Sequence, residues 1–262
     1  MKLNIVPART GLLWVKLGVQ TFFRQPLALT GLFFMYMAAV LVISQFPLIG
    51  PLLAAMLVPA ATLGFMAATA EASRGRFPMP TVLVSAFRAG RQRARAMLAL
   101  GALYTLGALV ATLLASLLTG DPSVTLPADA EMPQVDARTL VTLLFHMPLV
   151  VLFWHAPALV HWHGIAPAKS LFFSAVAFGR NLGAMLVYGL AWMAVFAAIG
   201  FGVSTLVLAL GSPDTARVVM MPTVLVLVVM FSSSLYFTFR DSFRADEAPA
   251  PESPNSGGES TP

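Results

Sequence analysis

The sequence predicts an all-α membrane protein, a bundle of about six transmembrane helices. Of its 262 residues, 58% are hydrophobic and only 10% charged, whereas soluble domains carry roughly 25% charged residues. Each helical residue rises about 1.5 Å, so about 20 apolar residues cross a hydrocarbon core of about 30 Å. Six blocks without Asp, Glu, Lys or Arg meet this length. They are residues 27–46, 47–70, 96–118, 140–162, 183–210 and 218–239.

The first two blocks adjoin each other without a polar loop. Between them lie Ser44-Gln45-Phe46-Pro47 and Gly50-Pro51. Proline lacks a backbone donor and glycine is flexible, so this stretch favours a tight reversal over one very long helix. We therefore expect a hairpin here.

The basic residues predict the orientation of the bundle. Fourteen of the sixteen Lys and Arg flank the blocks on one side, and only Arg138 and Arg217 lie on the other. Loops that stay in the cytoplasm retain the positive charge. The sequence thus predicts a multi-pass protein of a bacterial inner membrane with both termini in the cytoplasm. Because these charges follow topology and do not gather on one exposed face, no nucleic-acid partner is expected.

Three stretches with aromatic residues and a basic end precede the first, third and fifth blocks. They span Gly11 to Arg24, Thr81 to Arg95 and Ala168 to Arg180, and we expect amphipathic helices on the cytoplasmic surface. The second block of each pair also has a proline near its start, at Pro51, Pro148 and Pro222. A threefold repeat of in-plane helix plus hairpin would produce this pattern, but any protein with an even number of spans also has basic inner loops.

The predicted domain organisation is simple. Residues 1–244 form one transmembrane domain. Residues 245–262 contain no apolar residue larger than alanine or proline, so this segment cannot bury a core. We expect it to be a disordered cytoplasmic tail.

The four histidines, His146, His155, His161 and His163, all lie in or next to the fourth block. Imidazole binds haem and metals, so a haem or metal site is one interpretation. The spacing argues against it, because a helical zinc pair needs ligands four residues apart with a carboxylate nearby. An interfacial belt of His161, Trp162 and His163 explains the cluster better.

Two kinds of residue bear on how the spans pack. Pro59 and Pro157 lie inside the second and fourth blocks and would kink these helices. In transporters such kinks expose backbone groups along a substrate pathway. A purely structural bend is the other interpretation. Small residues recur at every fourth position, which permits close helix packing. These ridges are Ala60, Gly64 and Ala68; Gly107, Ala111 and Ala115; and Ala194, Ala198 and Gly202.

The most basic stretch contains Arg88, Arg91, Arg93 and Arg95. Each such residue near an anionic membrane surface contributes about 1 kcal/mol of binding, so contact with anionic lipids is one interpretation. A topology signal without a specific partner is the other.

No nucleophile elbow, zinc-protease, phosphate-binding or dinucleotide motif is present, and no cysteine. We therefore expect no enzymatic activity and no cofactor.

Several short segments of the sequence resemble those of an uncharacterised family of six-span inner-membrane proteins from proteobacteria, of beta-proteobacterial type. The resemblance rests on residues 153–159 (FWHAPAL), 164–170 (GIAPAKS) and Arg180-Asn181, and it covers about residues 1–243. It implies an integral inner-membrane protein and supplies no reaction or ligand.

Three functions remain in view. The first is a non-enzymatic scaffold or accessory factor that engages lipids or another envelope protein. The second is a small-molecule permease without a buried charge for coupling, since the spans contain none. The third is a haem or metal protein using the histidines. The sequence predicts no oligomeric state.

Overall fold

The computed structural model describes residues 2–120, 137–210 and 213–244, and these are almost entirely helical. The tail and the acidic loop residues Asp121, Asp129, Glu131 and Asp136 lie outside the described residues. The elements are β1 (Lys2–Leu3), α1 (Thr10–Arg24), α2 (Pro26–Ser44), α3 (Ile49–Ser73), η1 (Pro80–Val84), α4 (Ser85–Arg88), α5 (Arg91–Thr119), α6 (Ala137–Phe153), α7 (Ala156–His163), α8 (Pro167–Arg180), α9 (Leu182–Leu210), α10 (Pro213–Ser242) and β2 (Phe243–Arg244).

The six predicted spans are confirmed. Within the described chain, six helical segments are long and apolar enough to cross a membrane, and each coincides with a predicted block to within a few residues. The fourth segment consists of two helices, α6 and α7. The predicted reversal between the first two blocks is a turn at residues 45–48, where Leu48 adopts φ 65°. Gly50 belongs to α3, where its missing side chain lets the helix approach the end of α2.

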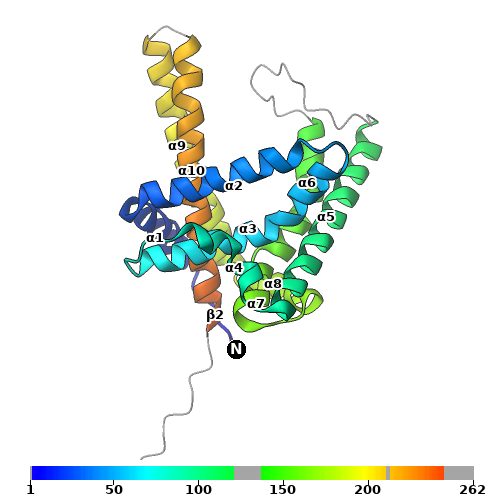
Figure 1. Ribbon diagram of the computed structural model, residues 1–262. Helices are drawn as coiled ribbons and strands as arrows, with labels where there is room; N and C mark the ends of the chain where they lie inside the picture. The colour runs from blue at the N-terminus through cyan, green and yellow to red at the C-terminus, as the bar shows by residue number, and fades with distance from the viewer. Residues whose placement is uncertain (1, 121–136, 211–212, 245–262) are drawn as a thin grey trace, which may run out of the picture.

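The helices form three hairpins that differ in direction (Figure 1). The hairpin of α9 and α10 and the hairpin of α5 and α6 extend toward the top of the view. The hairpin of α2 and α3 runs between them at a steep angle to α9 and α10. The chain ends, α7 and α8 lie toward the bottom, so the molecule has one end rich in short elements.

The two ends of the chain are joined at this end of the bundle. β1 pairs antiparallel with β2, with Lys2 opposite Arg244 and Leu3 opposite Phe243. The Asn181 side chain accepts a hydrogen bond from the Val6 backbone at 2.9 Å and donates one to the Asn4 carbonyl oxygen at 3.0 Å. Residues 2–3 and 243–244 therefore lie on one side of the bundle, as an even number of spans requires.

Helix α1 is amphipathic, and its apolar face is buried inside the protein. Gly11, Trp14, Gly18 and Phe22 form this face, which packs against α9 and α10. The glycines lie against the backbones of the two long helices, so α1 approaches them closely. Leu12, Leu13 and Phe23 on the opposite face are exposed, as expected of a helix at a membrane surface.

The short helices follow a cyclic packing pattern. Helix α1 packs on the hairpin of α9 and α10, η1 and α4 pack on α3, and α8 packs on α6 and α7. The first unit is α1 with the hairpin of α2 and α3, the second is η1 and α4 with α5 to α7, and the third is α8 with α9 and α10. Each short element thus contacts the hairpin of the unit before it in the chain, and α1 of the first unit contacts the hairpin of the third. Three equivalent units in a ring would give this pattern, which supports the threefold repeat without requiring it.

Two details of the predicted units are wrong. The stretch from Thr81 to Arg95 is not one helix: Gly90 adopts φ 101°, which ends α4, and Arg91 to Arg95 form the first turn and a half of α5. Pro148 and Pro222 do not lie near helix starts, because α6 and α10 begin about ten residues before them. Only Pro51 lies in a first turn.

Two of the three small-residue ridges are helix interfaces. Ala60 and Ala68 are buried, and Gly64 lies against Leu83. Ala111 and Ala115 are buried, and Gly107 faces Leu149 of α6. The ridge of Ala194, Ala198 and Gly202 is exposed instead, because the outer half of α9 has few neighbours.

Candidate functional site

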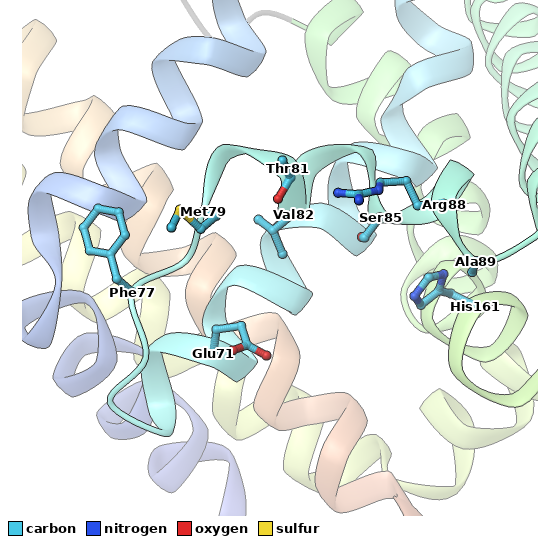
Figure 2. Close-up of a pocket in the computed structure, with 9 residues that line it drawn as sticks. All are labelled: Glu71, Phe77, Met79, Thr81, Val82, Ser85, Arg88, Ala89 and His161. Carbon is cyan, nitrogen blue, oxygen red and sulfur yellow. The ribbon is translucent and has the colours of Figure 1, made fainter.

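A cavity of about 460 Å³ lies where the end of α3, the segment from η1 to α4 and the end of α7 meet. Figure 2 shows its side chains around an open centre. The Arg88 side chain extends over Ser85, His161 enters from α7, and Glu71 lies across from them on α3. Phe77, Met79 and Val82 supply the apolar wall.

Polar groups of this cavity lack partners. Ser85 Oγ and His161 Nδ1 are buried and form no hydrogen bond within the described residues. Glu71 is already paired, because both nitrogens Nε and Nη2 of Arg76 bind its carboxylate, at 2.6 and 2.9 Å. Leaving a buried polar atom unpaired costs about 1–3 kcal/mol. These two atoms are thus unpaired groups within the wall of the cavity and do not reach its surface.

The basic start of α5 extends this site. Arg91, Arg93 and Arg95 are exposed in the first turns of α5, and Arg93 lies close enough to His161 for their charges to interact. No acidic residue occupies the first turn of α5. The amino end of a helix carries partial positive charge and free N–H groups. Four arginines beside it make a strongly cationic surface that stabilises anions.

The histidines do not converge. His146 Nδ1 lies 2.8 Å from the Thr142 carbonyl oxygen on α6, whereas His161 lines the cavity and His163 packs on Phe239. His155 is fully buried, with Nε2 3.3 Å from Thr238 Oγ1. Among the described residues, no three His, Asp or Glu side chains are placed to hold a metal ion.

The break between α6 and α7 explains the buried serine of α8. Ser174 Oγ accepts a hydrogen bond from the His155 backbone N–H at 3.0 Å and donates one to the Val151 carbonyl oxygen at 2.9 Å. These two backbone groups would bond each other in a continuous helix. The Ser174 hydroxyl thus bridges these two backbone groups in place of their direct hydrogen bond. Pro157 lies just beyond the break, in the first turn of α7.

A smaller cavity of about 170 Å³ lies deeper, between α3, α5, α6 and α10. Thr62, Tyr104 and His146 provide its polar groups. Val58 lines it, but the neighbouring Pro59 does not, and Pro157 does not either. Helix α3 continues through Pro59. Neither of the two prolines predicted as pathway positions thus lines this cavity.

The sequence pointed to Arg88 and His161 but missed Ser85 and Glu71. Arg88 and His161 were selected separately, one for charge and one for its imidazole. Nothing in the sequence indicated that the two lie in one cavity, because 73 residues separate them. Only the packing of α7 beside α3 and α5 brings them together. A single serine in a short helix belongs to no sequence pattern that predicts a binding site.

The chain has a relative in Burkholderia thailandensis. It is 37% identical over 268 aligned residues, which cover 97% of this chain and 98% of the relative, and it is described as a probable inner membrane protein. The chain belongs to this family. Membership confirms the resemblance seen in the sequence and, with the six apolar helices, makes the chain an integral membrane protein. No family model and no solved structure matches it.

The family resemblance rested on residues that hold this fold together. Within residues 153–159, Trp154 Nε1 donates to Thr238 Oγ1 at 3.1 Å and His155 binds Ser174. Ser170 is buried in α8, and Asn181 anchors the amino-terminal segment. These phrases of the family therefore have a structural role in this chain.

Proposed function

We propose that the protein is a non-enzymatic accessory or scaffold factor of the inner membrane that engages anionic lipid headgroups through Arg88, Arg91, Arg93 and Arg95. The observation that carries the proposal is the clustering of these arginines. Arg88 lines the cavity, and Arg91, Arg93 and Arg95 are exposed at the adjoining start of α5, where no acidic residue lies in the first turn. Guanidinium groups bind phosphate through paired, charge-assisted hydrogen bonds. In the orientation that the basic residues predict, this surface faces the cytoplasm. The phosphate headgroups of the inner leaflet are abundant there.

The test compares lipid enrichment around the protein. Wild type and a variant with all four arginines replaced by Gln are reconstituted in nanodiscs of mixed phosphatidylglycerol and phosphatidylcholine. The wild type should retain phosphatidylglycerol preferentially, as measured by native mass spectrometry after mild release, and the Gln variant should lose that preference. A variant with four Arg→Lys changes keeps the charge and should retain most of it. Unchanged enrichment in the Gln variant would remove lipids from the proposal and leave an envelope protein as the partner.

A second candidate, a small-molecule permease, is favoured by the deeper cavity alone. Its polar groups Thr62, Tyr104 and His146 lie among the spans, where polar side chains typically mark pathways. Uptake of a broad solute panel into proteoliposomes tests it, with the Tyr104→Phe variant as comparison. Absence of flux above empty liposomes would count against a permease.

A further inference from the structure

Three arginines from distant parts of the chain line a second cavity, of about 390 Å³. Arg24 ends α1, Arg74 follows α3, and Arg240 lies in the last turn of α10. The lining residues include no carboxylate. Arg240 is paired with the Asp241 carboxylate, whereas Arg24 and Arg74 have no carboxylate partner among the described residues. An anion in this space would therefore be attracted by both of these guanidinium groups.

All three arginines lie at span ends. Arg24 precedes α2 by two positions, Arg74 comes directly after Ser73 at the end of α3, and Arg240 lies two residues before the end of α10. Helices that cross a bilayer place their ends at the level of the headgroups. The cavity therefore lies at the depth of lipid phosphates and not in the hydrocarbon core.

Two of the guanidinium groups are held in position by the protein. Arg24 Nη1 donates to the Ser73 carbonyl oxygen at 3.1 Å. Arg240 Nε donates to Asp241 Oδ1 at 2.8 Å, and its guanidinium carbon lies 4.9 Å from the centre of the Phe237 ring. The side chain of Arg74 forms no ion pair or hydrogen bond with any described residue. Each arginine thus retains N–H groups for a further acceptor, because a guanidinium has five donors.

We propose that Arg24, Arg74 and Arg240 form a binding site for the phosphate group of an anionic molecule. Leu17, Tyr236 and Phe237 line the same cavity, so an amphiphilic molecule finds apolar surface beside the charges. The inference rests on the proposed lipid-engaging function and assigns it a second, separate site. The two sites share no lining residue.

The experiment titrates purified full-length protein in a mild nonionic detergent with phosphatidylglycerol, phosphatidylcholine or inorganic phosphate, and follows adducts by native mass spectrometry. We expect saturable phosphatidylglycerol binding. Replacing Arg74 by Gln should raise its Kd about tenfold, the loss expected for one charge-assisted contact. Arg24→Gln should act similarly, and the exposed Arg180→Gln in α8 is the matched control that should change nothing.

The outcomes separate the sources of phosphate and the two sites. Binding of phosphatidylglycerol without competition by inorganic phosphate supports a lipid headgroup, and competition at low millimolar phosphate supports a soluble phosphorylated molecule. Equal binding by Arg74→Gln, Arg24→Gln and wild type would overturn this site. If those two variants bind normally while the Arg88, Arg91, Arg93 and Arg95 variant does not, the proposed function stands without it. If Arg74→Gln and Arg24→Gln lose binding while the Arg88, Arg91, Arg93 and Arg95 variant binds normally, this site stands and the first one does not.

Discussion

At the scale of single residues, the most informative side chain is Ser174. One hydroxyl serves both backbone groups that the break between α6 and α7 would leave unpaired, the Val151 carbonyl oxygen and the His155 N–H. In a bilayer no water compensates such groups, so they must be satisfied within the protein. Ser174 therefore allows the fourth span to change direction without a penalty for the lost helical bond.

Replacing Ser174 by Ala removes a single oxygen atom but should lower the stability of the protein strongly. Each orphaned buried group costs about 1–3 kcal/mol, and the substitution creates two. Ser170 is the matched control, because it is equally buried in α8 but bonds only the Pro167 carbonyl oxygen within its own helix. Thermal unfolding in detergent, followed by circular dichroism, measures both variants. Equal midpoints for Ser170→Ala and Ser174→Ala would contradict the role assigned here.

These residue roles could not be predicted from the sequence. His155 and Asn181 were recognised only as parts of sequence segments shared with a family. Their roles depend on partners 19 and 177 positions away in the chain, Ser174 for His155 and Asn4 for Asn181. Local patterns carry no information about such contacts. Pro157 did indicate a disturbance in the span, because a missing N–H acts within its own helix.

At the scale of elements, α1 shows how a predicted surface helix became part of the core. Its amphipathic pattern was visible in the sequence, but the pattern does not reveal whether the apolar face meets lipid or protein. Gly11 and Gly18 decide it, since each lies directly against a neighbouring backbone. Close approach of this kind is the general means by which helices associate in membranes.

A side chain at Gly18 should therefore separate α1 from α10. In Gly18→Ala the added Cβ would lie 2.5 Å from Ser234 Cβ and 2.8 Å from its Cα, closer than any real contact, and overpacking of this kind costs about 1–3 kcal/mol. Gly31→Ala in α2 is the control. Nothing lies within 4 Å of its added Cβ, so helix propensity should leave stability unchanged or raised by up to about 1 kcal/mol. The unfolding midpoint of Gly18→Ala should thus fall, while that of Gly31→Ala stays equal or rises. An unchanged midpoint for Gly18→Ala would contradict the packing of α1.

At the scale of the whole molecule, the spans were predictable and their arrangement was not. Exclusion of charge from 20 residues is a property of composition, which the bilayer enforces on every span. The steep angle of the α2 and α3 hairpin to α9 and α10 (Figure 1) arises from side-chain packing between hairpins, which composition does not encode. For the same reason, the cavities at the span ends could not be predicted from the sequence, because the arginines that line them come from distant parts of the chain.

The orientation of the molecule can be tested directly because the chain contains no cysteine. Single cysteines are introduced at Ala209, the last residue of the fifth span, and at Lys169 in α8, both of them exposed. With the basic residues held in the cytoplasm, a membrane-impermeant maleimide should label Ala209→Cys in intact spheroplasts and label Lys169→Cys only after permeabilisation. The cysteine-free wild type gives the background. Since both chain ends lie on the side of α8, labelling of Lys169→Cys from outside would place the termini and both arginine cavities in the periplasm, away from the anionic inner leaflet on which the lipid-binding proposals depend.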